Sequence, residues 1–323
     1  MTSLVHPREA LFEGEKPFPA LSACEHYAGS EERIAKALEL QAKLGPVFDV
    51  SCDCEDGARH GAEREHALMV ARALRSPANR FRRVGARVHD PEHPAFHDDV
   101  TILAPASPAF IVIPKVISAR QAAAAIDVVR GACDQPIPIH LLVETHGALR
   151  EADALAALPG VETLDFGLMD FVSAHHGAIP ESALRSPGQF EHPLVARAKL
   201  EIAAAALAHG VVPVHNVTLD FRNPATAGND ARLARERFGY LRQWSIHPAQ
   251  IEPIVAAFRP SHDQVETAAA ILLAAWKGGW GPIQHAGEMH DKATYRLYWE
   301  LLQRAALAGA PLPAEARAAF FAA

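Results

Sequence analysis

Two acidic residues stand where two short apolar runs of the chain end. Residues 141–143 run into Glu144, and residues 164–166 are followed closely by Asp170. Short apolar runs between turn residues are typical of buried strands, and a carboxylate at the end of such a strand needs a cation or a hydrogen-bonding partner. Two carboxylates on successive strands indicate a shared divalent cation with oxygen ligands. The alternative at this point is that both acids cap helices or pair with arginine.

Other polar residues also follow the apolar runs. They are Glu55, Asp56, Arg87, Lys115, Asn216 and His247. Taken singly, each has a structural explanation, such as an ion-pair partner for Arg87 or a satisfied core histidine for His247. A Schiff-base role is open for Lys115, although Pro114 beside it favours a structural or substrate-binding lysine. Their shared position at strand ends is what favours a functional site.

Eight strand-like runs alternate with helical runs. We expect strands at residues 20–24, 47–54, 84–88, 110–113, 137–143, 161–166, 211–214 and 241–246. Such alternation predicts a parallel sheet, and eight repeats predict an α/β fold of the (β/α)₈ TIM-barrel type, with its active site at the carboxyl ends of the strands. An open doubly wound sheet is the competing fold, but no GxGxxG follows any strand, which weakens a dinucleotide-binding version.

The pattern divides the chain into a barrel and an extension. Residues 1–260 are expected to form the TIM-barrel catalytic domain with an N-terminal arm. Residues 261–323 are expected to form a C-terminal helical extension, with helices near 263–276 and 292–307 joined by a mobile glycine-rich linker that carries a lid. Residues 171–190 form a long loop, of a length that is usually functional or disordered.

Composition limits the classes of partner. The net charge of −7 argues against nucleic acid and anionic membranes as general partners. No run of 18 apolar residues occurs and the N-terminus lacks a signal-peptide pattern, so we expect a cytoplasmic protein. The four cysteines lack the spacing of a zinc site and are expected to be buried thiols, in keeping with a reducing compartment.

Seven motifs occur in order between residues 20 and 300. Asp-Cys-Glu-Asp-Gly-Ala at 53–58 stands where a known family has Asp-Leu-Glu-Asp-Ala-Val. Further matches are Arg-Val-His at 87–89, Ile-Pro-Lys-Val at 113–116, Val-Glu-Thr at 143–145, Phe-Gly-Leu-Met-Asp at 166–170, Trp-Ser-Ile-His-Pro-Ala-Gln-Ile at 244–251 and Gly-Glu-Met-His-Asp at 287–291. Together they resemble the HpcH/HpaI aldolase and citrate lyase β-subunit family, especially its CitE-like and malyl-CoA lyase branch.

The sequence also departs from that family. The family's opening Arg-Ser-x-Leu-x-x-Pro is absent, and residues 22–30 stand there instead. Cys54 and Gly57 change the end of the second strand, His89 replaces an asparagine, and the pair His175-His176 is untypical. These departures bear on the acyl-CoA substrate more than on the fold or the metal.

The resemblance implies a Mg²⁺-dependent carbon–carbon lyase that converts a 3-hydroxyacyl thioester to a 2-keto acid and an acyl-CoA. Glu144 and Asp170 would hold Mg²⁺ with coordination positions open for the keto acid. Arg87 would stabilise the enolate of the acyl group. Asp291, on the lid, would move a proton at the acyl carbon.

The remaining matched residues receive supporting roles from the same resemblance. Glu55 joins the catalytic group, and together with Asp56 it would hold metal-bound waters and orient Arg87. Arg87, Asp56 and Lys115 would bind substrate. In the family the lid often comes from a neighbouring subunit, so a homotrimer or hexamer is expected.

Three alternatives remain open. The first is a hydrolase of malyl-type thioesters that uses the same metal. The second is a metal-dependent aldolase acting on keto acids without CoA. The third is a non-catalytic subunit that retains the barrel, against which the joint presence of Glu144, Asp170, Arg87 and Asp291 argues.

Overall fold

The computed structural model describes residues 5–321 except 16, 17 and 59. The chain divides into two compact units. One is Ala23–Phe258, and the other consists of the described residues of Met1–Ser22 and Arg259–Ala323. The N-terminal arm therefore groups with the C-terminal extension, whereas the sequence analysis placed it with the barrel. The reason is that α1 (Pro7–Phe12) buries Leu11 and Phe12 in the hydrophobic core of the C-terminal helices.

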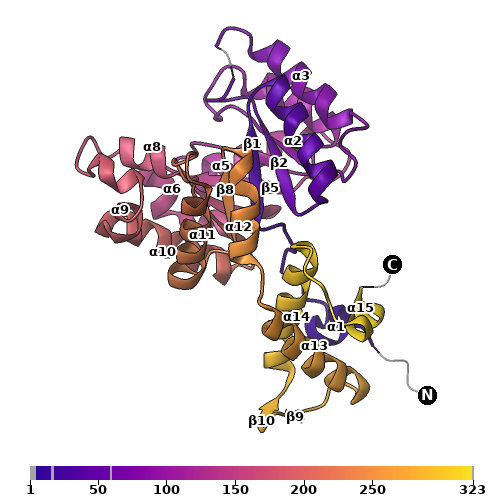
Figure 1. The fold of residues 1–323 in the computed structure, drawn as a ribbon. Helices are drawn as coiled ribbons and strands as arrows, with labels where there is room; N and C mark the ends of the chain where they lie inside the picture. The colour runs from indigo at the N-terminus through magenta and orange to yellow at the C-terminus, as the bar shows by residue number, and fades with distance from the viewer. Residues whose placement is uncertain (1–4, 16–17, 59, 322–323) are drawn as a thin grey trace. The chain divides into compact units, whose positions relative to one another are not determined.

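The larger unit is a closed barrel of eight parallel strands, which confirms the TIM-barrel prediction (Figure 1). The strands are β1 (Cys24–Ala28), β2 (Phe48–Asp53), β3 (Val84–Arg87), β4 (Ile111–Ile113), β5 (Ile139–Val143), β6 (Val161–Phe166), β7 (Val212–His215) and β8 (Arg242–Ser245). Each strand pairs in parallel with the next, and β8 closes the barrel on β1, with Cys24 opposite Gln243.

Seven longer helices follow the strands. They are α2 (Glu31–Leu44), α3 (Glu63–Arg75), α4 (Phe96–Leu103), α5 (Ala119–Gly131), α10 (Pro193–Ala208), α11 (Pro224–Phe238) and α12 (Ile251–Phe258). Ser30 and Ser118 cap α2 and α5 by accepting hydrogen bonds from backbone N–H groups one turn on. Serine is among the residues preferred at this position, and Gly45 is the C-cap of α2.

The first strand lies four residues later than predicted, at Cys24–Ala28 instead of 20–24. It was missed because its buried side chains include Glu25 and His26, which interrupt an apolar pattern. Glu25 pairs with Arg242 on β8 at 2.8 Å. His26 Nδ1 lies 2.8 Å from the Ser245 hydroxyl. These partners offset the cost of placing polar residues inside the barrel.

Short helices occupy two segments that follow strands. After Glu144 come α6 (His146–Arg150) and α7 (Ala152–Ala156), which are broken at Glu151, whose carboxylate accepts from the Ala119 N–H at 2.8 Å. The loop expected at 171–190 contains the end of α8 (Leu168–Ser173), the 3₁₀ helix η2 (Glu181–Leu184) and α9 (Gly188–Glu191). It is therefore largely structured.

The smaller unit packs its helices around Trp299, Tyr295 and Leu272. Its elements are α1, α13 (His262–Lys277), α14 (Lys292–Leu307), α15 (Ala314–Phe320) and the antiparallel pair β9 (Ile283–His285) and β10 (Glu288–His290). The glycine-rich linker thus leads into a hairpin that ends at Asp291.

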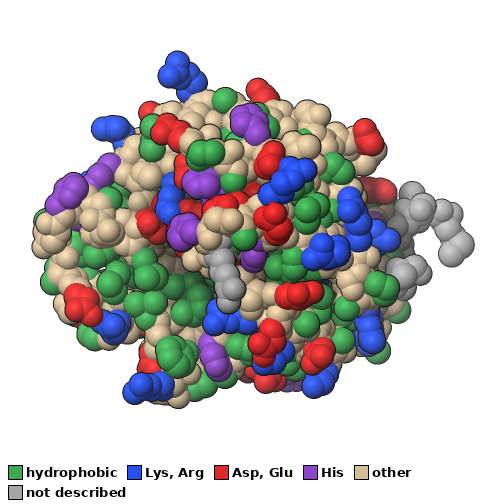
Figure 2. Space-filling model, turned by 90° about the horizontal axis from the view of Figure 1, so that it is seen from above, with side chains coloured by type: hydrophobic (Ala, Val, Ile, Leu, Met, Phe, Trp, Pro, Cys, Tyr) green, Lys and Arg blue, Asp and Glu red, His purple; other side chains and the backbone are tan. Residues whose placement is uncertain are grey.

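The surface carries charges of both signs. Acidic and basic side chains are interspersed over the face shown in Figure 2, together with several histidines.

Among the described residues, no helix combines the length and apolar character needed to cross a membrane. The four cysteines, all in the described part of the chain, are thiols, and three of them are buried.

Candidate active site

A pocket of about 240 Å³ opens among the carboxyl ends of the barrel strands, where TIM-barrel enzymes carry their active sites. Its polar wall contains Tyr27, Arg87, Glu144 and Asp170. Its apolar wall includes Leu142, Phe166, Leu168, Met169, Val217, Trp244 and Ile246. All of these residues belong to the barrel unit.

The two acids singled out in the sequence line this one pocket. Glu144 follows β5 and is buried, and Asp170 lies in the first turn of α8. Helix capping does not explain Glu144, because Thr145 is the residue that caps α6. A Cβ atom on Gly167 would collide with Oε2 of Glu144, so this glycine allows the carboxylate to sit against the backbone.

Burial, and then the charge of Asp170, raise the pKa of Glu144 to about 8. Two neighbouring carboxylates disfavour each other's ionised form unless a cation lies between them. Their oxygen donors suit a hard divalent ion such as Mg²⁺. The donor set therefore fits the metal that the sequence predicts.

Arg87 ends β3 and is almost fully buried. Its Nε lies 2.6 Å from Oδ1 of Asp53 and its Nη1 lies 3.0 Å from Oε2 of Glu55. Although burial opposes the charged form, these carboxylates keep the pKa of Arg87 above its ordinary value. Asp53 is itself fixed by the backbone N–H groups of Glu55 and Gly57. The guanidinium is therefore charged and firmly oriented.

Lys115, Glu55 and Asp56 form a cluster next to Arg87. Nζ of Lys115 lies 2.5 Å from Oε1 of Glu55 and 3.2 Å from Oδ1 of Asp56. Burial raises the pKa of Glu55, against the lowering effect of the Arg87 charge. Asp56 is more than half exposed. Glu55 thus pairs with both cations, and its contact with Lys115 was not predicted from the sequence.

Asp291 belongs to the other unit, where it is the N-cap of α14. Its carboxylate accepts from the Ala293 N–H at 3.0 Å, and Thr294 completes a capping box. His247, for which a core position was the structural interpretation, is exposed and caps the 3₁₀ helix η3 (Pro248–Gln250).

Asn216, the remaining residue predicted at a strand end, lines the pocket and belongs to a buried network. Its Oδ1 accepts from Nζ of Lys199 at 2.5 Å. Lys199 is fully buried on α10, and its ammonium lies over the rings of Phe166 and Phe190. The Ala-rich sequence of this helix gave no sign of such a lysine.

Sequence analysis also missed Tyr27, Asp53, Asp165 and Trp244. Tyr27 was missed because β1 was placed four residues early. Asp53 was noticed only within a motif. Trp244 Nε1 donates to Oδ2 of Asp165 at 2.8 Å. These residues could have been identified from the alternation of polar residues within the short strands.

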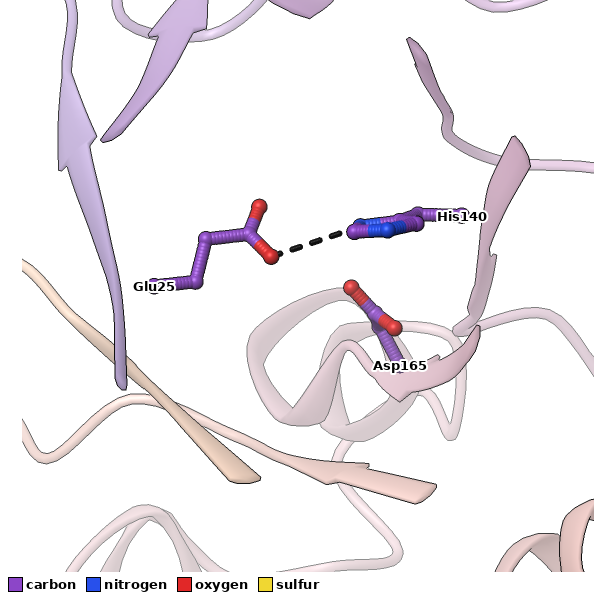
Figure 3. A group of neighbouring side chains, drawn as sticks. All are labelled: Glu25, His140 and Asp165. Atoms are coloured by element: carbon purple, nitrogen blue, oxygen red, sulfur yellow. Dashed lines mark ion pairs between the residues drawn. The ribbon is translucent and has the colours of Figure 1, made fainter. Parts of the chain in front are cut away.

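A second acidic group lies within the barrel strands themselves. Glu25, His140 and Asp165 are buried and point toward one another from β1, β5 and β6 (Figure 3). Burial opposes protonation of His140, but the carboxylates of Glu162 and Glu25 raise its pKa to about 9.

Arg242 completes this group, 2.8 Å from Glu25 and 2.7 Å from Asp49. Arginine and a protonated histidine already supply the positive charge that a metal would bring. We therefore assign this group to the barrel's internal ion pairs.

The chain is similar to several known proteins. The family model of HpcH/HpaI aldolase/citrate lyase matches residues 48–245. A crystal structure of a citrate lyase from Burkholderia xenovorans LB400 is 51% identical with a TM-score of 0.82, covering 99% of this chain and 100% of that chain. A (3S)-malyl-CoA thioesterase from Cereibacter sphaeroides is 27% identical over 241 residues, which are 74% of this chain and 78% of the relative.

A more distant structure shares the fold. It is the CitE protein of Mycobacterium tuberculosis in complex with magnesium, acetoacetate and coenzyme A, 23% identical with a TM-score of 0.65, covering 89% of this chain and 99% of that one. The matched family region runs from β2 to β8 and includes Arg87, Glu144 and Asp170. The resemblance seen in the sequence motifs is thereby confirmed, and the chain belongs to the HpcH/HpaI aldolase/citrate lyase family.

Proposed function

We propose that this protein is a Mg²⁺-dependent carbon–carbon lyase that interconverts a 3-hydroxyacyl thioester with a 2-keto acid and an acyl-CoA. The observation that carries the proposal is the meeting of the Glu144–Asp170 acid pair and the Arg87 guanidinium on one pocket of about 240 Å³. The magnesium in the structure of the Mycobacterium tuberculosis protein supports the choice of ion. When bound, Mg²⁺ supplies Lewis-acid polarisation of the keto-acid oxygen.

The chain's own residues account for the rest of the reaction. In cleavage, the bond between the carbinol carbon and the α carbon of the thioester breaks, and the hydroxyl group gives its proton to a water molecule and becomes the carbonyl group of the keto acid. The bonding electron pair stays with the acyl part as an enolate. Arg87, held by Asp53 and Glu55, faces this developing negative charge. Lys115 and Asp56 bind the polar parts of the substrate beside it.

The enolate must then take up a proton at its α carbon. We assign this transfer to Asp291 on the hairpin of the smaller unit, acting as a general acid in cleavage and as a base in condensation. Its capping hydrogen bonds fix the carboxylate at the start of α14. A lid supplied by a neighbouring subunit of a homotrimer or hexamer is part of this proposal.

A thioester hydrolase is the second candidate, because a relative of 27% identity is named (3S)-malyl-CoA thioesterase. In that reaction water attacks the thioester carbonyl, the C–S bond breaks and the thiol leaves with a proton. A CoA-independent aldolase and a non-catalytic subunit are the two remaining candidates.

One experiment separates these activities. Purified protein is incubated with malyl-, citramalyl- and citryl-thioesters and Mg²⁺, while keto acid and thiol are assayed separately. Keto acid without thiol identifies the lyase, and thiol without keto acid identifies the hydrolase. If neither forms, free 4-hydroxy-2-keto acids test the CoA-independent aldolase, and inactivity there leaves the non-catalytic subunit.

Two variants test the metal site. Glu144→Gln and Asp170→Asn should abolish Mg²⁺-dependent turnover and Mg²⁺ binding by calorimetry. Asp127→Asn is the control, because this acid is exposed on α5 beside Arg130. Normal turnover of either site variant with the metal chelated would show that the assignment is wrong.

A further inference from the structure

Tyr27, at the end of β1, is a wall of the pocket that the sequence motifs do not include. Its ring covers the Arg87 guanidinium, whose Cζ lies 4.9 Å from the ring centroid. The Tyr27 ring also contacts Trp244, with ring centroids 5.8 Å apart. The Tyr27 hydroxyl lies between Arg87 and Asp53 and is hydrogen-bonded to both. A strand end that departs from the family pattern therefore carries a side chain in direct contact with Arg87.

The directions of these two hydrogen bonds follow from the partners. A carboxylate only accepts and a guanidinium only donates. The Tyr27 hydroxyl thus donates to Oδ2 of Asp53 and accepts from Nη2 of Arg87. Nη2 also donates to Asp53, at 3.1 Å, and Nε donates to Asp53 at 2.6 Å. Both hydrogens of Nη2 are consequently engaged, and Nη1, which pairs with Glu55, is the nitrogen left to meet a ligand oxygen.

Gly57 makes room for this hydroxyl. A Cβ atom at position 57 would lie 2.8 Å from the hydroxyl oxygen of Tyr27 and 2.5 Å from Oδ2 of Asp53. The φ angle of Gly57 is not positive, so conformational freedom of the backbone does not explain why glycine occupies this position. The family motif has alanine at this position. Tyr27 and Gly57 both depart from the family pattern, and the Tyr27 hydroxyl occupies space that a Cβ atom at position 57 would need.

We propose that Tyr27 is a positioning residue of the active site, and that Gly57 is its required steric partner. The hydroxyl turns Arg87 so that Nη1, and not the Nη1–Nη2 edge, faces the substrate. Arg87 then offers one donor nitrogen to a single oxyanion, such as a thioester enolate oxygen, and does not clamp a carboxylate with two. This inference rests on the proposed lyase function for its catalytic part and on geometry alone for its steric part.

The catalytic part is tested with Tyr27→Phe, which keeps the ring on Arg87 and Trp244 and removes only the hydroxyl. We expect kcat of the lyase reaction to fall about tenfold or more, with KM changed by less than about threefold, because a misdirected donor acts mainly in the transition state. Tyr298→Phe, in the smaller unit, is the control and should leave both constants unchanged. A Tyr27→Phe enzyme within about threefold of wild type in kcat, or one altered only in KM, would overturn the role.

The steric part is tested without activity, by a double-mutant cycle on the urea midpoint of unfolding. Gly57→Ala should lower the midpoint in the wild-type background and lower it by less than half as much beside Tyr27→Val, which removes the ring and hydroxyl. Gly131→Ala, whose Cβ would meet nothing within 4 Å, is the control and should show no coupling to position 27. Equal effects of Gly57→Ala in both backgrounds would overturn the pairing.

The catalytic part and the steric part of this inference can be contradicted independently of each other. If the wild-type protein cleaves none of the thioesters, the lyase proposal fails and the catalytic role of Tyr27 fails with it, while coupling at position 57 can still be found. If the wild type is active and Tyr27→Phe is unimpaired, only the inference about Tyr27 is wrong.

Discussion

The backbone N–H of Lys115 donates a 2.8 Å hydrogen bond to Oε1 of Glu144, and Lys115 has a φ of 52°. This left-handed conformation is unfavourable for a residue with a side chain and tends to persist where the surroundings enforce it. The backbone N–H of Lys115 thus holds Glu144 of the acid pair, and the Lys115 ammonium group pairs with Glu55. These two contributions can be separated by substitution.

Lys115→Gly and Lys115→Ala both remove the ammonium group, but only glycine adopts positive φ without cost. We expect Lys115→Gly to be more stable than Lys115→Ala by about 1 kcal/mol. Both variants should show raised KM for the thioester, since Lys115 is proposed to bind substrate. Urea unfolding and steady-state kinetics measure the two effects. Equal stability of the two variants would mean that the left-handed conformation is absent in solution.

Gly167→Ala should weaken Mg²⁺ binding. The new Cβ would collide with the Glu144 carboxylate and push it from its position beside Asp170. We expect a loss of affinity of about tenfold or more, the range found when groups that orient a ligand are disturbed. Isothermal titration calorimetry measures it, with Gly131→Ala as the matched control. Unchanged affinity would argue against Glu144 as a ligand.

Mg²⁺ binding should strengthen as pH rises toward 8. Without metal the pKa of Glu144 is about 8, so below that pH a proton competes with the ion. Affinity should rise by up to about tenfold per pH unit and level off above pH 8. Calorimetry at pH 6.5, 7.5 and 8.5 tests this. Glu144→Gln, which cannot ionise, should bind weakly at each pH, and a pH slope retained in that variant would contradict the assignment.

The same ionisation predicts how the metal-free protein responds to pH. Because the folded pKa of Glu144 lies above its ordinary value of 4.5, the native state holds more protons than the unfolded state between these pH values. Its contribution to the free energy of unfolding is therefore full below pH 4.5 and is lost as pH rises through 8. Urea unfolding in chelator should show Glu144→Gln gaining stability relative to wild type as pH rises from 5 to 8. A constant difference would contradict the shift.

Arg242→Met should destabilise the barrel strongly. The substitution leaves Glu25 and Asp49, both buried, without the guanidinium that lies within 2.8 Å of each. Removing one partner of a buried ion pair costs about 3–5 kcal/mol. Arg232→Met, which breaks an exposed pair with Glu236 on α11, should cost less than about 1 kcal/mol. Chemical denaturation measures both, and similar costs would mean that the internal ion pairs contribute little.

Asp291→Asn and Asp291→Ala separate the two uses of this carboxylate. Asparagine is as good an N-cap as aspartate, so Asp291→Asn should keep the stability of the smaller unit while turnover falls. Asp291→Ala should lose turnover and about 1 kcal/mol of stability. Binding of pyruvate should be unaffected in both. Unchanged turnover of Asp291→Asn would restrict the residue to its capping role.

The sequence predicted the barrel because strand-like runs alternate with helical runs, and seven of the eight strands lie within two residues of their expected positions. β1 was the exception, since Glu25 and His26 depend on Arg242 and Ser245 more than 200 residues away. No local pattern reveals a partner so distant. The helix caps Ser30 and Ser118 are different, because each contacts a backbone N–H only three residues further along the chain.

The same distinction holds for the pocket. Glu144, Asp170, Arg87 and Lys115 could be proposed because each directly follows or lies close to the end of an apolar run. Tyr27 could not, because its role depends on contacts with Asp53 and Gly57, which come from another strand end. The burial of Lys199 likewise depends on the tertiary contacts of α10, in a helix whose composition is mostly apolar.

Helix α1 packs Leu11 and Phe12 against Trp299 and its neighbours, and His6 Nε2 lies 3.2 Å from the carbonyl oxygen of Phe320. Helix α1 and the C-terminal helices are therefore parts of one folded body, and the barrel lies between them in the sequence. Shortening the chain at its start would open the core beneath the Asp291 hairpin and leave the barrel's own packing in place. We expect a variant that lacks α1 to be impaired in the proposed proton-transfer step and to keep its metal binding.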